Sequence, residues 1–356
     1  MGLRAESVTS KPALTRRQLL ALALPASLLP SHLDAARRAP SCEALGEVSA
    51  NFCSDLQAAS DYDTIGRPPQ PLPLQVVGAY WTRWNPQIRL SRLPTAYNLI
   101  YLFAATRSGG GGVTWGLNGI AADIRICRAR GQRIILSAGG ARQGIDFRNR
   151  RVSTRFVESI SRINSQLGGS ALAPAIDGLD FNTFEGNFTP NITEYRWMGK
   201  ELKRRFGASF IVTAPPAPWK AADRAFCRAM LTAGAMDYAA PQYYDGPGLA
   251  NEKYIVTSTT RWVREVARGD ASKIVVGFGV GSQSNYLSVQ KIMSSWRQIE
   301  ARHPDIRGAF LWHHKRDFDR GWSFAKQMAP VKGDRTDLPN LLPPLLRPPV
   351  LPGGAD

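Results

Sequence analysis

A strand–loop–helix unit recurs eight times between residues 74 and 330, and this repetition most narrows the folds open to the chain. Each unit begins with a short apolar segment and continues into a polar loop and an amphipathic helix. Strands that alternate with helices pair in parallel, so the pattern predicts an α/β fold. The predicted strands cover residues 74–81, 98–105, 133–139, 174–181, 209–215, 236–244, 273–279 and 308–312.

Eight such units are what a closed, parallel (β/α)8 barrel, the TIM barrel, requires. A doubly wound open sheet is the alternative, but no strand-to-helix turn carries its dinucleotide fingerprint. The glycine run at 108–112 follows the second predicted strand, yet it opens no helix and no lysine follows it. We therefore predict a (β/α)8 domain over residues 74–330, with no nucleotide cofactor.

The residues before this domain are typical of an export signal and a leader. Arg16 and Arg17 precede the apolar stretch QLLALALPASLLP, which is too short to cross a bilayer. Paired arginines at this place are typical of the twin-arginine route, and an ordinary secretory signal is the alternative. The sequence thus predicts an export signal over 1–36 and a proline-containing leader over 37–73. We expect an exported protein, periplasmic or extracellular, whose mature form has no membrane span.

The overall charge narrows the partners only slightly. The formal net charge is +17, but the arginines are spread over predicted helices and not massed in one arm. We interpret this as a solvated basic surface and expect a monomer with no specific nucleic-acid partner, although a cell wall or membrane surface is an alternative. Six prolines mark residues 331–356 as a nonhelical tail.

The cysteines and histidines do not predict a metal site. The four cysteines include no CxxC pair, and only Cys42 and Cys53 lie near enough in sequence to suggest a disulfide. Of the four histidines, His313 and His314 are adjacent, and adjacent side chains on a strand point to opposite faces. We therefore expect neither a metal nor a cofactor.

Polar and aromatic residues gather where the predicted strands end. The fourth strand runs into DGLDFNTFEG, the sixth into PQYYD, and the last ends in Trp312. In a barrel these carboxyl ends meet at one face, where active sites form. Each aromatic residue alone could be core packing, but acids among aromatic platforms are the usual constellation for a sugar site. The sequence therefore predicts a carbohydrate cleft.

Residues 74–329 resemble glycoside hydrolase family 18, the chitinases and endo-β-N-acetylglucosaminidases. The similarity is in strands one, two, three, five, six and eight, in the segments VVGAYWTRW, YNLIYLFAA, IILSAGG, IVTAPPAP, MDYAAPQYYD and GAFLW. The resemblance implies a secreted hydrolase of β-1,4-linked N-acetylglucosamine glycans, chitin or a related polymer. It also implies that the substrate's own acetamido group takes part, which makes the family an exception to the two-carboxylate scheme.

The family's fourth-strand signature, D-x-x-D-x-D-x-E, is altered here. Asp177 and Asp180 match its first two acids, whereas Asn182 stands at the third. Phe184 takes the place of the glutamate, and Glu185 comes one residue later. Side chains alternate along a strand, so Glu185 enters the cleft only if the chain bulges or leaves strand geometry just before it. We predict that it does.

The resemblance also implies roles for the strand-end residues. Glu185 would be the general acid, Asn182 would accept the acetamido N–H, and Tyr244 would contact the acetamido carbonyl. Asp180 would keep the neighbouring polar chain charged and ordered. Substrate contacts are expected from Asp177, Tyr80, Gln242, Tyr243, Asp245 and Trp312.

Asn182 leaves a second class of function open. It can accept the N–H hydrogen bond, but it adds no negative charge to the site, and losing such a partner commonly costs about 10²–10³ in rate. The alternative to a hydrolase is thus a chitinase-like carbohydrate-binding protein that has little or no turnover. An unrelated barrel hydrolase is the third possibility.

Overall fold

The computed structural model describes residues 68–85, 87–184 and 189–333. The predicted export signal, nearly all of the leader, Glu185 and the tail from residue 334 lie outside the described residues. Among the helices that are described, none is both long enough and apolar enough to cross a membrane.

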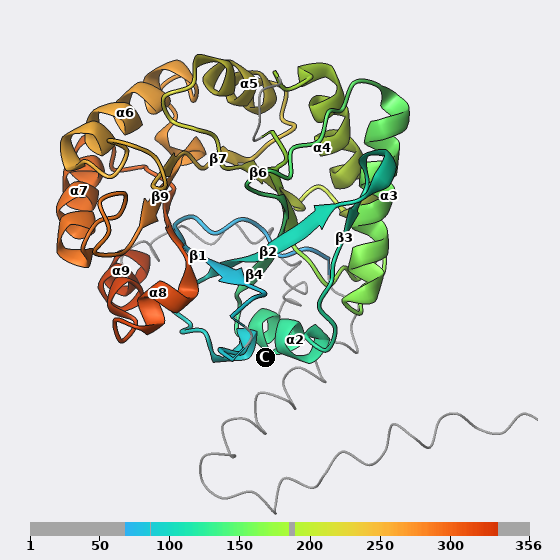
Figure 1. Ribbon diagram of the computed structural model, residues 1–356, viewed down its shortest axis with the longest axis horizontal. Coiled ribbons are helices and arrows are strands. Elements are labelled where there is room, and N and C mark those ends of the chain that lie inside the picture. Colours follow the sequence, from blue (N-terminus) through green and yellow to red (C-terminus); the bar gives the residue numbers. More distant parts are fainter. Residues whose placement is uncertain (1–67, 86, 185–188, 334–356) are drawn as a thin grey trace, which may run out of the picture. The chain divides into compact units, whose positions relative to one another are not determined.

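Within the described residues, eight strand positions form one parallel ring (Figure 1). They are β1 (Val76–Thr82), β2 (Leu99–Arg107), β4 (Arg133–Gly139), β5 (Gly178–Asn182), β6 (Ile211–Ala214), β7 (Tyr238–Ala239) together with β8 (Gln242–Tyr243), β9 (Val275–Gly279) and β10 (Gly308–Trp312). The hydrogen-bonded order β7-β6-β5-β4-β2-β1-β10-β9-β8 starts and ends on consecutive pieces of the chain, so the ring closes. The predicted (β/α)8 barrel is confirmed.

The sixth strand is the one whose observed bounds differ most from the predicted ones. Residues 236–244 read as one strand, but the structure divides them into β7 and β8 around Pro241. Proline has no N–H to donate to a neighbouring strand, so the ladder is interrupted there. The Pro241 carbonyl still accepts a hydrogen bond from the Gly277 amide at 3.0 Å, which keeps the divided strand in the ring.

Helices surround the strands, as Figure 1 shows. They are α2 (Ala121–Ala129), α3 (Arg150–Gln166), α4 (Ile192–Phe206), α5 (Ala221–Thr232), α6 (Glu252–Glu265), α7 (Val289–Arg302), α8 (His314–Phe318) and α9 (Ser323–Gly333). The Asn191 side chain accepts from the Glu194 amide at 3.4 Å and caps the amino-terminal end of α4. A short strand, β3 (Val113–Thr114), pairs antiparallel with the end of β2.

Two apolar layers result from the alternation of side chains along the strands. Outward residues such as Leu179 and Phe181 pack with the helices in the larger cluster. Inward residues such as Tyr101 and Phe310 fill the barrel itself. The same alternation turns Asp180 inward, into the barrel, between its two outward neighbours.

The end of the barrel opposite the carboxyl ends is covered by residues 68–73. The Gln70 amide donates to Oδ1 of Asp177 at 2.8 Å, directly before β5. The Ser209 hydroxyl, before β6, donates to the Pro69 carbonyl at 2.8 Å. The last part of the predicted leader is thus hydrogen-bonded to the barrel and packs across the amino-terminal ends of its strands.

Candidate active site

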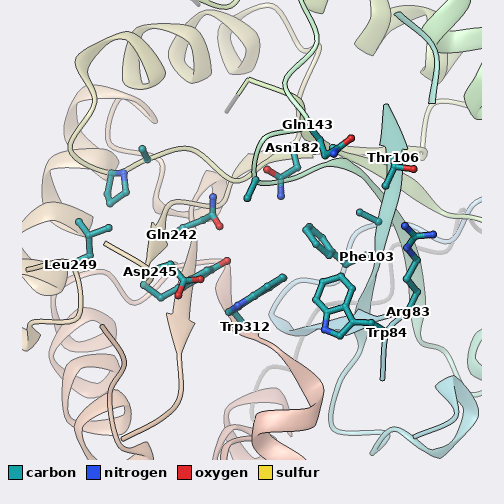
Figure 2. Close-up of a pocket in the computed structure, with 16 residues that line it drawn as sticks. Arg83, Trp84, Phe103, Thr106, Gln143, Asn182, Gln242, Asp245, Leu249 and Trp312 are labelled. Carbon is teal, nitrogen blue, oxygen red and sulfur yellow. The ribbon is translucent and has the colours of Figure 1, made fainter. Parts of the chain in front are cut away.

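A cavity of about 540 Å³ opens at the carboxyl ends of the strands. Its lining comes from β2, β4, β5, β8 and β10 and from the loops after β1, β4, β6 and β8 (Figure 2). The residues that matter most here are Trp84, Phe103, Asn182, Gln242, Tyr244 and Trp312. We call this space the sugar cavity, after the ligand that the sequence predicts for it.

A buried carboxylate lies beneath the sugar cavity. Oδ2 of Asp180 accepts hydrogen bonds from the Tyr80 hydroxyl at 2.9 Å and from the Ser137 hydroxyl at 2.7 Å. Burial and the nearby Asp180 charge raise the pKa of Tyr80 well above its ordinary value, so the phenol keeps its proton and acts as the donor. Asp180 itself is completely buried and does not line the cavity.

Aromatic rings form the apolar wall of the sugar cavity. The rings of Tyr244 and Trp312 are nearly parallel, with an interplanar angle of 3° and centroids 6.0 Å apart. Trp84 meets Trp312 edge-on with centroids 6.3 Å apart, and 54% of Trp84 is exposed. Flat apolar surfaces of this kind suit the apolar face of a sugar ring, whose burial removes carbon surface from water.

Asn182 brings an amide to the cavity wall. Its Oδ1 is buried and has no hydrogen-bond partner among the described residues, which is a costly state unless a ligand or solvent satisfies it. Its backbone carbonyl accepts from the Gly140 amide at 2.7 Å. Gly139, at φ +101°, has no side chain, and a Cβ there would collide with that carbonyl. The S-x-G-G segment thus places Asn182.

Gln242 and Asp245 add further polar groups to the lining of the cavity. Nε2 of Gln242 donates to the Pro215 carbonyl at 2.6 Å, which leaves Oε1 as the amide atom able to accept from a ligand. Asp245 lines the cavity and accepts a hydrogen bond from the Tyr286 hydroxyl. The wall therefore offers a carbonyl oxygen and a carboxylate to hydroxyl or amide donors.

The chain leaves strand geometry directly after Asn182. The Thr183 hydroxyl shares a hydrogen bond of 2.8 Å with the Tyr195 hydroxyl of α4. The Phe184 ring packs on Phe226 of α5, with centroids 5.1 Å apart. Two successive side chains therefore face the helix layer, and the alternation is interrupted at the place that the sequence suggested. Glu185 lies outside the described residues, and its predicted entry into the cleft stays a prediction.

Asp177 is not in the cavity, and the prediction of a substrate contact there is wrong. It precedes β5 at the opposite end of the barrel and is completely buried. Its carboxylate forms an ion pair with Arg128 at 3.0 Å and accepts from the Ile134 amide at 2.9 Å. Burial raises the pKa of Asp177, and the Arg128 charge opposes that shift. The residue stabilises the barrel.

Tyr243 and Tyr80 also do not line the cavity. Tyr243 points into the helix layer, where its hydroxyl donates to the Ser258 hydroxyl at 3.2 Å. Tyr80 is 1% exposed and packs edge-on under Trp312, with centroids 5.3 Å apart. The predicted substrate contacts of both tyrosines are therefore wrong, although the Tyr80 hydroxyl donates to Asp180 beneath the cavity.

The structure brings to the cavity several residues that the sequence did not single out. Phe103 is two residues beyond the inward Tyr101, so the alternation along β2 contained the signal. Arg83, Thr106 and Gln143 line the cavity as well. Arg83 and Gln143 lie in loops, where no periodicity predicts which way a side chain points.

Neither a metal nor a disulfide is indicated in the described part of the chain. No group of three or more His, Cys, Asp or Glu side chains there could hold a metal ion. Cys127 and Cys227 are buried and free. Cys42 and Cys53 lie outside the described residues.

Fold and site together define a class of protein: a (β/α)8 barrel with a polar, aromatic-walled cleft at the carboxyl ends of its strands. Comparisons with known proteins narrow that class. No family profile matches the chain. The chain is 30% identical over 190 residues to chitinase Chi52 of Paenibacillus xylanexedens, a match that covers 49% of this chain and 36% of the relative. The match thus spans little more than a third of that chitinase.

Solved structures agree in fold. A family 18 chitinase from Chromobacterium violaceum superposes with a TM-score of 0.64 at 19% identity, over 74% of this chain and 84% of its own. A xylanase–α-amylase inhibitor protein, solved with trehalose, superposes with a TM-score of 0.56 at 16% identity, over 70% and 97%. The chain is thus a chitinase-like protein with the barrel fold of glycoside hydrolase family 18, a fold that an inhibitor protein shares.

Proposed function

We propose that the protein is an exported hydrolase of β-1,4-linked N-acetylglucosamine glycans, with Glu185 as its general acid. The observation that carries the proposal is the buried Oδ1 of Asn182, which lines the sugar cavity without a partner in the described structure. An acetamido N–H is a donor of the kind that this oxygen lacks. The similarity to chitinases supports the same glycan.

In the proposed reaction Glu185 gives its proton to the glycosidic oxygen as the bond from that oxygen to the anomeric carbon breaks. The substrate's acetamido oxygen attacks the same carbon and forms an oxazolinium ion. Water then attacks the anomeric carbon from the face that the leaving group left, which opens the ion with net retention, and returns a proton to Glu185. Asn182 would hold the acetamido N–H, and Tyr244 would contact the acetamido carbonyl.

The interruption after β5 supports the role of Glu185. Because Thr183 and Phe184 both face the helix layer, a chain that resumed alternation would turn Glu185 to the side of Asn182. The shift of one residue relative to the family signature would then be compensated by the backbone. If Glu185 enters the cleft, the negative charge of Asp180 would favour the protonated form that a general acid needs.

The second candidate is a carbohydrate-binding protein without turnover. The observation that favours it is Asn182 itself, since an amide cannot balance the positive charge of the oxazolinium ion as a carboxylate would. The inhibitor protein of the same fold supports this reading as well.

One experiment separates the two candidates. The purified protein is incubated with a chitin oligosaccharide, and both cleavage and affinity are measured for the wild type and Glu185→Gln. The hydrolase proposal expects cleavage that Glu185→Gln abolishes, with affinity retained. Glu158→Gln, an exposed position on α3, is the matched control and should cleave like the wild type. Binding without cleavage in both Glu185 forms would establish the binding protein instead.

A further inference from the structure

We propose that a second cavity, beside the sugar cavity, binds an acidic substituent of the glycan, a carboxylate or a phosphate monoester. The inference rests on the proposed function, because the acid is carried by the same glycan chain. This arginine cavity has a volume of about 590 Å³ and lies between the loops after β2 and β4 and the start of α3. Its charged lining residues are Arg107, Asp146, Arg148, Arg151 and Arg155.

The protein does not neutralise these four guanidinium groups. In the described part of the chain none of them forms an ion pair with a carboxylate. Nη1 of Arg107 donates only to the Gly144 carbonyl, at 3.1 Å. Asp146 is exposed and is likewise not paired with any arginine there. Four positive charges against one negative charge leave the cavity with donors for an anion.

The start of α3 strengthens the positive potential. A helix N-terminus carries partial positive charge and normally has acidic residues in its first turn. The first turn of α3 has none, and it begins instead with Arg150 and Arg151. Arg150 is paired with Glu194 at 3.0 Å, whereas Arg151 lines the cavity. The local charge is thus unfavourable without an anion.

The glycine run at 108–112 shapes the wall of the arginine cavity. A Cβ at Gly110 would collide with the guanidinium of Arg155, and one at Gly111 would collide with the side chain of Val152. Both glycines also have positive φ, of 70° and 92°. Because glycines have no side chain, the loop can pack this closely on α3, and the Arg155 guanidinium has room beside it.

The two cavities adjoin. The Arg107 amide donates to Oε1 of Gln143 at 3.1 Å, and Arg107 lines the arginine cavity while Gln143 lines the sugar cavity. Thr106, the residue before Arg107, lines the sugar cavity too, and Figure 2 shows it beside Gln143 at one edge of the site. A glycan that leaves the sugar cavity past the end of β2 would bring its next units to the arginines.

The chemistry of these groups indicates the class of glycan. Guanidinium groups bind carboxylate and phosphate through paired, charge-assisted hydrogen bonds, and a neutral N-acetylglucosamine polymer offers neither anion. The fitting substrate therefore carries acid-bearing sugars next to its N-acetylhexosamine units. Because the arginines are exposed, the attraction should weaken as salt is added.

Calorimetry with three oligosaccharides of equal length tests the inference. One is neutral, one carries carboxylates and one carries phosphate monoesters on alternate sugars. The wild type should bind an acidic oligosaccharide about ten-fold more tightly than the neutral one at low salt, and the better of the two identifies the acid. The Arg148→Gln/Arg151→Gln double variant should lose this preference and keep its affinity for the neutral oligosaccharide. Arg297→Gln/Arg302→Gln, on α7, removes the same charge elsewhere and should keep the preference.

The outcomes separate this inference from the proposed function. Equal affinity of the wild type for all three oligosaccharides would overturn the inference, and so would a preference that both double variants lose equally. If the protein neither binds nor cleaves the neutral oligosaccharide but keeps the arginine-dependent preference, the anion site stands and the chitin substrate falls. Binding of inorganic phosphate alone, with no affinity for any of the glycans, would overturn both.

Discussion

Asp180 and Asn182 leave β5 on the same side, yet Asn182 lines the sugar cavity while Asp180 is completely buried beneath it. The carboxylate is therefore two positions before the amide along β5 and lies below the surface that a substrate would touch. Asp180 accepts from two hydroxyl groups, and the amide of Asn182 above it is the polar group that lines the cavity.

A carboxylate at position 182 should restore the charge that the family signature has there. If the protein is a hydrolase, Asn182→Asp should raise kcat on an N-acetylated substrate by about 10-fold or more, because preorganised charge stabilises the oxazolinium-like transition state. Asn182→Ala should lower it. The rates are measured on chitin oligosaccharides with proteins that keep the wild-type circular dichroism. A slower Asn182→Asp enzyme would show that the amide is the better group in this site.

Among the aromatic residues that line the sugar cavity, Trp84 can be removed with least damage to the fold. It lines the cavity but is 54% exposed, so Trp84→Ala should change the free energy of unfolding by no more than about 0.5 kcal/mol. The affinity for N-acetylglucosamine oligosaccharides should fall about five- to ten-fold, because an apolar platform of the cavity is lost. Phe318→Ala, at an exposed aromatic outside the cavity, is the control. Unchanged affinity in Trp84→Ala would exclude this ring from the binding surface.

Arg128 and Asp177 form a buried ion pair, with 6% and 0% of their side chains exposed. Arg128→Met should lower the free energy of unfolding by about 3–5 kcal/mol, because it leaves a buried carboxylate without its partner. Urea unfolding followed by tryptophan fluorescence measures this loss. Arg228→Met, at an exposed position on α5, should have little effect. Asp177→Asn should leave KM unchanged, and a raised KM would return Asp177 to the substrate site.

His313 and His314 should make the protein less stable in mild acid. Burial lowers the pKa of His313 to about 3 and that of His314 to about 4, from an ordinary 6.5. Between the ordinary pKa of about 6.5 and the lowered values of about 4 and about 3, the unfolded chain binds protons that the folded protein does not. The free energy of unfolding should therefore fall as the pH falls, by up to about 1.4 kcal/mol per pH unit for each ring.

Urea unfolding at several pH values measures that slope, and NMR titration of the imidazole signals identifies its origin. The same titration in concentrated urea gives the reference pKa values of the unfolded chain. A titration of either ring near 6.5 in the folded protein would contradict the assignment for that ring.

The barrel could be predicted from the sequence because it depends on a pattern repeated over the whole domain. Each unit of apolar strand, loop and amphipathic helix carries the same information, so an error in one leaves the others intact. The division of the sixth strand was the exception, and Pro241 was its local cause, since a missing N–H overrides the apolar run around it.

The site was predicted less completely, because the sequence motifs did not show at which end of a strand, or on which side of it, each side chain lies. Tyr243 lies between Gln242 and Tyr244, so alternation alone would have turned it to the helix layer. Asp177 matches the family motif, but the match does not show that this residue, three positions before Asp180, lies at the opposite end of the barrel from the cavity. Loop residues such as Gln143 have no periodicity, and only the folded chain shows where they point.

Residues 68–73 set the limit for shortening this protein. They are far from the sugar cavity, yet the Gln70 amide is one of the partners of the Asp177 carboxylate, and Pro69 is buried. A chain cut to begin at Leu74, where the apolar repeats start, would open the floor of the barrel to water and remove a donor from a buried acid. We expect such a truncated protein to be recovered in poor yield, whereas one that begins at or before Pro68 should be soluble. A shortened protein should therefore begin with the residues that cover the amino-terminal end of the barrel, and not with the first strand–helix unit.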